Sequence, residues 1–302
     1  MRPFTIDDVV FAAQAGCVLE ASVDKPGNVG PSHDFTDTKY EDFLLSGIAM
    51  GSAVRRAVEF GMLYKPGKSG LGRLIRSAVE ESARRHRGRN TNLGMTLLMT
   101  PLSASAGIAI GSGDFSRKAL RSGVSRVING STPEDTVELY TAIASAHAEV
   151  GKSRSFDVND PKSRQKILEN KMNLQDIFNV SKWDSVAREL VTEMEVTFTL
   201  GLPALEEEFE KTGSFRSSVM RCFMEILARV PDTLIERKNN HETAIEVSNE
   251  ARAILEKGLK TRDISAFDAK LCCEGNRYNP GTTADLTASS IMAAGLEGLF
   301  IR

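Results

Sequence analysis

Three short polar segments have residue types that could bind a nucleotide, and each of them adjoins apolar segments of helical periodicity. The first covers residues 25–29 and is followed by His33 and Asp34, so that a cation and a carboxylate lie in one connection between helices. Lysine offers a phosphate three N–H donors, and a glycine lets backbone amides approach an anion. An ordinary helix connection is the simpler interpretation of this segment alone. Its candidate ligands are Lys25, Gly27, Asn28 and Asp34.

The second polar segment covers residues 89–94 and precedes a long apolar segment. The first N–H groups of a helix have no partner within it and carry the positive end of its dipole, so they can bind an anion. Asparagine or threonine at this place can also cap the helix. One cap would leave two of the side chains of Asn90, Thr91 and Asn92 unexplained beside Arg89. Binding and capping are therefore both open.

The third polar segment covers residues 279–286 and includes Gly281 and Asp285. Asp285 is expected in the first turn of a helix, where the helix dipole favours a carboxylate and where that carboxylate could also bind magnesium. A structural aspartate is the simpler interpretation of this position alone. Three junctions of similar chemistry in one chain predict one shared polar site at one end of a helical bundle.

Two further carboxylates, Asp135 and Asp232, are weaker candidates, because a helix cap explains each of them. If they converge with Asp34 and Asp285 in the fold, the set would supply the carboxylate oxygens and water positions that magnesium needs. The sequence therefore predicts Mg²⁺ as a cofactor. Its predicted ligands are Asp34, Asp135, Asp232 and Asp285.

Helical periodicity extends over most of the chain, whereas the alternating pattern of strands is almost absent. The predicted fold class is all-α, a compact multi-helix bundle with one domain over residues 1–302. Gly47 and Gly51 indicate the close approach of another helix. The polar segment 156–163 is either a ligand loop or a link between layers. Helices are predicted over residues 6–22, 39–60, 71–87, 93–110, 115–127, 133–148, 181–211, 216–229, 241–257, 264–274 and 283–299.

The composition excludes several classes of protein. With 302 residues, of which 41% are hydrophobic and 26% charged, the chain is typical of a folded globular protein. The formal net charge of −2 gives no general attraction to nucleic acid or to a membrane surface. The four cysteines fit neither a disulfide framework nor a zinc site, which favours the cytoplasm. We expect no signal peptide and no membrane span, since no stretch approaches the roughly 18 apolar residues that a span requires.

Taken in order, the three junctions resemble the triphosphoribosyl-dephospho-CoA synthase family. Each motif alone is weak, whereas the ordered set is fairly specific and extends from one end of the chain to the other. The resemblance implies an all-helical fold over the whole length. The matching residues are 25–29, Asp34 and Phe35 with Phe43 and Ser46, 90–94 with Pro101 and Leu102, Asp232 and Thr233 with Arg237, 279–281, and 284–286.

This resemblance implies a transferase that joins ATP to dephospho-CoA through the anomeric carbon of the ribose and releases adenine. Breaking an N-glycosidic bond develops an oxocarbenium-like sugar, which a carboxylate can stabilise, while magnesium and lysine hold the triphosphate. By matching position, the resemblance assigns Asp34 and Asp285 to metal or general-base duty, and Lys25 and Asn28 to phosphate contact. The nucleotide-binding residues that it implies are Lys25, Gly27, Asn28, Asn90, Thr91, Asn92, Arg237 and Gly281.

Two departures from the family pattern leave the acceptor open: Arg89 stands where a glycine-rich approach is expected, and residues 156–171 match no feature of the family. One alternative is a related helical enzyme that uses ATP or phosphoribosyl diphosphate on another coenzyme precursor, such as a pterin. Another is a non-catalytic nucleotide sensor or scaffold, in which the junctions are only loops and caps. The small-residue helices could pack within one chain or across a homodimer.

Overall fold

The computed structural model describes residues 4–36, 38–84, 92–146, 156–273 and 276–301 of the 302. Over these residues the fold is all-α, which confirms the predicted fold class. No strand occurs in this part of the chain, and one isolated antiparallel bridge joins Gly30 and His33.

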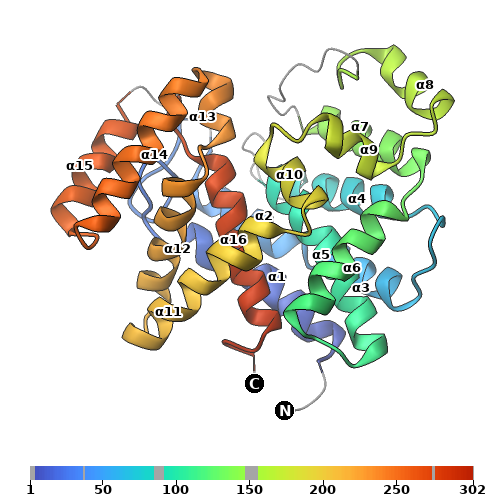
Figure 1. Cartoon of the computed structure of the whole chain (residues 1–302), viewed down its shortest axis with the longest axis horizontal. Helices are drawn as coiled ribbons and strands as arrows, with labels where there is room; N and C mark the ends of the chain where they lie inside the picture. The colour runs from blue at the N-terminus through green and yellow to red at the C-terminus, as the bar shows by residue number, and fades with distance from the viewer. Residues whose placement is uncertain (1–3, 37, 85–91, 147–155, 274–275, 302) are drawn as a thin grey trace.

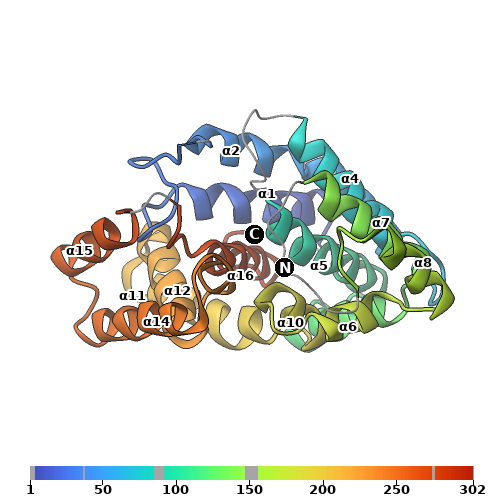
Figure 2. The same cartoon turned by 90° about the horizontal axis from the view of Figure 1, so that it is seen from above.

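A central helix, α16 (Gly281–Leu296), organises the fold (Figures 1 and 2). It packs along α1 (Ile6–Ala21) and beside α5 (Leu93–Ser112). Both α5 and α16 are buried over most of their length. They are rich in alanine, serine, threonine and glycine, whose small side chains let helix axes approach closely. The two helices and α1 thus form the middle of the main hydrophobic core.

The N-terminal half of the chain surrounds α5. Helix α3 packs along α5, α6 covers it from another side, and α4 pairs with α7. Helices α1 and α7 begin with capping boxes, formed by Thr5 with Asp8 and by Thr132 with Asp135. The bounds in this half are α2 (Tyr40–Ala49), α3 (Gly51–Met62), α4 (Leu71–Ala83), α6 (Arg117–Asn129) and α7 (Pro133–Ser145).

The C-terminal half lies mainly on the other side of α16, where α11 to α15 form the orange group in Figure 1. Helix α12 pairs with both α11 and α14. A second hydrophobic cluster, which includes Phe223 and Phe267, joins α12 to α13, α14 and α15. The remaining bounds are α8 (Pro161–Glu169), α9 (Leu174–Val180), α10 (Ser185–Val191), a π-helix (Thr197–Gly201), α11 (Leu202–Thr212), α12 (Phe215–Arg229), α13 (Thr233–Lys238), α14 (His241–Glu256) and α15 (Thr261–Leu271).

The prediction of one helix over residues 39–60 was wrong, because two helices, α2 and α3, meet there at Met50. The glycines of this segment have the role expected of them. A β-carbon at Gly47 would lie 2.5 Å from the Cβ of Cys17 in α1, so the two helices touch at this point.

The single helix predicted over residues 181–211 is also divided, into α10, the π-helix and α11. The backbone turns between them at Glu193 and Met194, whose φ angles are +56° and +53°. The buried carboxylate of Glu189 accepts a hydrogen bond from the N–H of Val196 at 2.7 Å. It thereby gives a partner to an N–H group that has none within the next helical segment. Apolar periodicity continues across this turn, and for that reason the turn was not predicted.

Three short helices, α8, α9 and α13, were not predicted. Helix α8 begins at Pro161, inside the segment 156–163, and the hydroxyl of Tyr140 donates to the carbonyl oxygen of Phe156 at 2.8 Å. This segment is therefore a link that packs against α7. Helices of six to nine residues span too few turns for periodicity to identify them.

Helix α5 corrects the expectation that no stretch of the chain is apolar enough to span a membrane. It is long and apolar enough by composition, but 83% of its most apolar window is buried inside the protein. Its apolar surface is thus covered by neighbouring helices, as in the core helix of a soluble protein. All four cysteines are free.

Candidate active site

The start of α16 is the point at which parts of all three polar segments meet. The first segment touches it at Gly27, where a β-carbon would lie 3.2 Å from the Cδ of Pro280. The second segment touches it at Gly94, which lies against the side chain of Asp285. The helix begins at Gly281, two residues earlier than predicted, so Asp285 is its fifth residue and lies just past the first turn. The tertiary structure therefore brings together segments that lie far apart in the sequence.

Asp285 joins the start of α16 to the start of α5. Its carboxylate accepts a hydrogen bond from the backbone N–H of Met95, and a β-carbon at Gly94 would lie 2.0 Å from its Oδ2. The residue keeps partial contact with solvent. Nevertheless, burial of the carboxyl group raises the pKa of Asp285 well above its usual range, and nearby negative charges raise this pKa further. These charges are the carboxylates of Glu20, Asp232 and Asp184.

Lys25 and Glu20 form a buried ion pair at the end of α1, with 3.1 Å between Lys25 Nζ and Glu20 Oε1. The same ammonium donates to the carbonyl oxygens of Glu20 at 2.6 Å and Val23 at 2.8 Å. None of the Lys25 side chain is exposed, so the loop encloses the ammonium completely. Burial raises the pKa of Glu20, against the opposing effect of Lys25. In this arrangement Lys25 stabilises the loop and is not accessible to a phosphate.

Asp232 joins the starts of α13 and α16. Its Oδ1 accepts the backbone N–H groups of Leu234 (2.9 Å) and Ile235 (3.1 Å), and its Oδ2 accepts the N–H (2.7 Å) and the hydroxyl (2.8 Å) of Thr283. The side chain is fully buried, and burial raises its pKa although the hydrogen bonds from Thr283 oppose this shift. Since four donors occupy the two oxygens, Asp232 fixes the site and is poorly placed to bind a metal.

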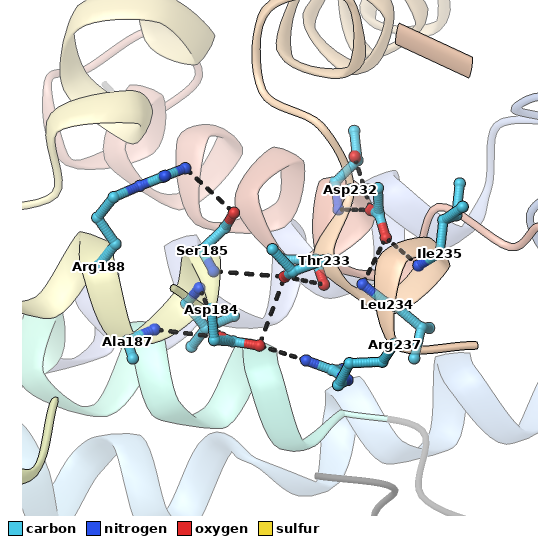
Figure 3. A network of polar contacts seen from close by, with 12 residues as sticks. Asp184, Ser185, Ala187, Arg188, Asp232, Thr233, Leu234, Ile235 and Arg237 are labelled. Atoms are coloured by element: carbon cyan, nitrogen blue, oxygen red, sulfur yellow. Dashed lines mark hydrogen bonds and ion pairs between the residues drawn. The ribbon is translucent and has the colours of Figure 1, made fainter. Parts of the chain in front are cut away.

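Figure 3 shows the polar network that links α10 with α13 through Asp184. The Oδ1 of Asp184 accepts the N–H of Val186 at 3.0 Å and caps α10, while its Oδ2 forms an ion pair with Arg237 and accepts the hydroxyl of Thr233 at 3.4 Å. The Nε of Arg237 is buried and has no hydrogen-bond partner among the described residues. Asp184 thus orients a guanidinium that still has a donor for a ligand.

Asp34 caps α2 at the surface. Its oxygens accept the N–H of Tyr40 at 2.9 Å and the ammonium of Lys39 at 3.0 Å, and its side chain is 42% exposed. The hydrogen bond from Tyr40, followed by that from Lys39, lowers the pKa of Asp34. No contact among the described residues joins it to Asp285.

Asp135 lies elsewhere, between α4 and α7. It is fully buried, and its oxygens accept the backbone N–H groups of Gly70 (2.7 Å), Gly72 (2.9 Å) and Thr132 (3.0 Å). These contacts give Asp135 a structural role at the junction of two helices. The convergence of the four predicted metal ligands is therefore not seen, because Asp135 is held in a different part of the fold.

The backbone of the first segment is also occupied. The N–H of Gly27 donates to Oδ1 of Asp268 in α15 at 2.8 Å, and its φ of +70° requires a glycine. Asn28 is buried beside it. Gly281, in the third segment, is the first residue of α16, and a β-carbon there would lie 2.6 Å from a methyl group of Leu234. Both glycines permit close packing around the site.

Of the second segment, only residues 92–94 lie among the described residues. Asn92 is buried at the N-cap position of α5. Asn90 and Thr91, which were predicted to contact the nucleotide, lie outside the described residues.

Two residues of this site were not singled out in the sequence. Asp184 stands directly before Ser185, as a helix cap would, but the continuous periodicity of residues 181–211 hid that signal. Glu20 lies one turn from Gly16 and Cys17 on the buried face of α1, where a carboxylate is unusual. A charged residue on an apolar helix face was the signal that could have identified it.

The predicted carboxylate ligands are too few to hold magnesium alone, so phosphate oxygens of a substrate would have to complete the site. Among the described residues, no three His, Cys, Asp or Glu side chains form a group that could hold a metal ion. However, Mg²⁺ usually keeps several waters and binds one or two carboxylates plus phosphate oxygens. Of the predicted ligands, Asp34 and Asp285 keep carboxylate lone pairs that no described donor occupies. Each of these two carboxylates has an oxygen to offer a magnesium ion that arrives with a triphosphate, although no contact among the described residues joins the two.

Residues 6–301 match the family model described as ATP:dephospho-CoA triphosphoribosyl transferase. No curated protein matches the chain. Among solved structures, the crystal structure of a protein from Archaeoglobus fulgidus, provisionally described as a triphosphoribosyl-dephospho-CoA synthase, is similar. It shares 25% identity with a TM-score of 0.62, over 84% of this chain and 99% of that chain. Because the family match spans nearly the whole sequence, the chain belongs to the ATP:dephospho-CoA triphosphoribosyl transferase family.

Proposed function

We propose that this transferase moves the triphosphoribosyl group of ATP to dephospho-CoA and that Asp285 is its catalytic carboxylate. Membership of the family supports the reaction. The place of Asp285 carries the second part of the proposal, because this carboxylate lies between the starts of α16 and α5 and keeps partial contact with solvent. Both segments that it joins were singled out by their polar residues.

The reaction needs a base and a stabiliser of positive charge. The oxygen of the acceptor hydroxyl bonds to C1′ of the ribose, the C1′–N9 bond breaks, and adenine leaves with the bonding electron pair. An ionised Asp285 can accept the hydroxyl proton and stabilise the oxocarbenium-like sugar. A pKa raised above the usual carboxyl range suits a base that works near neutral pH.

For the triphosphate, Arg237 is better placed than Lys25. The Lys25 side chain is enclosed within the loop, whereas the Arg237 side chain is 20% exposed and its Nε has no partner in the described structure. A guanidinium also binds phosphate oxygens through two parallel hydrogen bonds. Magnesium, when bound, would neutralise part of the triphosphate charge, and Asp285 or Asp34 would hold it.

The same proposal includes a soluble, cytoplasmic enzyme, which the free cysteines and the burial of α5 support. The homodimer stays a prediction. A pterin or another coenzyme precursor as the acceptor is the alternative that a product assay tests.

The test is to incubate the purified protein with ATP, magnesium and dephospho-CoA, and to measure free adenine and the triphosphoribosyl adduct by mass spectrometry. Both products are expected. If adenine is released only with a different acceptor, the proposed transfer reaction stands and dephospho-CoA is not the acceptor. Binding of ATP without any release of adenine would contradict the proposed reaction.

Two variants separate the duties of the carboxylates. Asp285→Asn should abolish adenine release and leave the binding of ATP with magnesium largely intact, as expected of a base. If this variant also loses magnesium-dependent binding of ATP, Asp285 is a metal ligand instead. Asp114→Asn is the matched control, because it changes an exposed carboxylate beyond the other end of α5.

A further inference from the structure

Two amide atoms near the start of α16 are buried and have no hydrogen-bond partner in the described part of the chain. They are Nδ2 of Asn28 and Oδ1 of Asn279. Asn28 is 5% exposed. Its Oδ1 accepts a hydrogen bond from the N–H of Val29 at 2.7 Å, so the Nδ2 amino group is the part of this amide that lacks a partner. Buried polar atoms in folded proteins nearly always have a partner. The two atoms therefore leave two polar groups at this place open to a polar partner.

The two amides belong to loops that are in contact. Gly27 precedes Asn28, Pro280 follows Asn279, and a β-carbon at Gly27 would lie 3.2 Å from the Cδ of Pro280. One free atom is a donor and the other is an acceptor. Since the two loops touch, one ligand lying against both would present an acceptor to Asn28 and a donor to Asn279 on the edge that faces them.

Adenine has such an edge. Its 6-amino group donates, and the neighbouring ring nitrogen N1 or N7 accepts; asparagine pairs with adenine in this way in nucleic-acid complexes. Hypoxanthine and guanine carry a carbonyl oxygen at position 6 instead. That oxygen would face the acceptor Oδ1 of Asn279, so the same pair of amides would disfavour both of these bases.

We propose that Asn28 and Asn279 form the adenine subsite of the enzyme, with Asn28 Nδ2 donating to a ring nitrogen and Asn279 Oδ1 accepting from the 6-amino group. This inference rests on the proposed function and adds to it the residues that select the base. It gives Asn28 a contact with the base in place of the phosphate contact expected from the sequence.

This subsite also assists the reaction. When the C1′–N9 bond breaks, adenine takes the electron pair and negative charge develops on its ring nitrogens. A hydrogen bond from Asn28 to N1 or N7 stabilises that charge. Overall, adenine gains one proton and the acceptor hydroxyl loses one, so no further reactant is needed.

The first test uses the unaltered protein with ATP, ITP and purine riboside triphosphate, which lacks the 6-amino group. Release of the free base should show a kcat/KM for ATP at least about tenfold above those for the other two, the effect of one hydrogen-bonded pair. Equal values for the three nucleotides would overturn the subsite. Thermal shifts with each nucleotide and magnesium test the same preference in binding, so the subsite can be judged even if the proposed transfer fails.

The second test uses substitutions that keep the shape of each amide. Asn28→Asp retains the oxygen that accepts the Val29 N–H and replaces only the free donor with an acceptor, so kcat/KM for ATP should fall about tenfold or more. Asn279→Leu removes the acceptor and should reduce the preference for ATP over ITP. Asn279→Asp, the matched control, keeps an acceptor and should keep that preference.

The ratio of kcat/KM for ATP to that for ITP is the deciding quantity, since a purely structural effect lowers both values alike. An unchanged ratio in Asn279→Leu, or an unchanged kcat/KM for ATP in Asn28→Asp, with the melting temperature retained, would contradict the proposal. If Asn28→Asp does not fold, the two substitutions at Asn279 still decide the matter.

Discussion

The Oδ2 atom of Asp285 occupies the space in which a side chain at Gly94 would lie, 2.0 Å from an ideal β-carbon at that position. The same carboxylate accepts the N–H of Met95, so its place depends on a close approach to the first turn of α5. A glycine is needed at position 94 because any larger residue would move the carboxylate. This relationship links the packing of two helices to the position of the proposed base.

The substitution Gly94→Ala should therefore lower kcat/KM by about 100-fold, since a displacement of about 1 Å can cost this much in rate. The assay is adenine release. Gly111→Ala in the same helix is the control, because no atom lies within 4 Å of a β-carbon added there. If both variants keep full activity, the position of Asp285 does not limit the reaction.

The activity should depend on the ionisation of Asp285. Burial and the neighbouring carboxylates raise the pKa of Asp285, and a base works only when ionised, so kcat/KM should rise with pH through a value above the usual carboxyl range. Glu20→Gln removes one of the negative neighbours and should shift this rise to lower pH. A profile whose acidic limb lies at an ordinary carboxyl pKa in both proteins would exclude Asp285 as the base.

The raised pKa of Asp285 should also appear in the stability of the protein. The folded state holds the proton of this carboxyl more tightly than the unfolded state does, so the favourable contribution is complete below the unfolded pKa and is lost as the pH rises through the folded pKa. Asp285→Asn removes this loss. The variant should have a higher melting temperature than the wild type at neutral pH, and the difference should vanish in acid.

The ion pair of Lys25 and Glu20 should be structural. Lys25→Met leaves a buried carboxylate without its partner, and the free energy of unfolding should fall by about 3–5 kcal/mol. Replacing both residues, with Glu20→Met added, should restore most of that loss. Urea unfolding measures the effect. A single variant of normal stability that no longer binds ATP would instead make Lys25 a phosphate ligand.

Asp135 should contribute to stability alone. Asp135→Ala leaves buried N–H groups of Gly70 and Gly72 without an acceptor, which should cost about 1–3 kcal/mol. The dependence of the reaction on magnesium concentration should not change, because Asp135 lies between α4 and α7. A higher magnesium requirement in this variant would restore Asp135 as a metal ligand.

Much of the fold could be predicted because the relevant interactions are local. Thr5 and Asp8 cap α1 from three residues apart, and Thr132 and Asp135 do the same for α7. Long helices such as α5 and α16 are apolar over several turns. The break at Met50 and the short helix α13 escaped prediction, since they offer few turns and depend on the helices that pack against them.

The sequence by itself determined that the chain is all-α, that three polar segments adjoin its helices, and that Asp285 lies near the start of one of them. It could not determine which polar side chain is free to react. The Oδ2 of Asp232 accepts two hydrogen bonds from Thr283, which is 51 positions away, while Asp285 faces Gly94 on a different helix. Burial and hydrogen bonding decide the pKa and the free lone pairs of each group, and these come from residues that only the tertiary structure brings together.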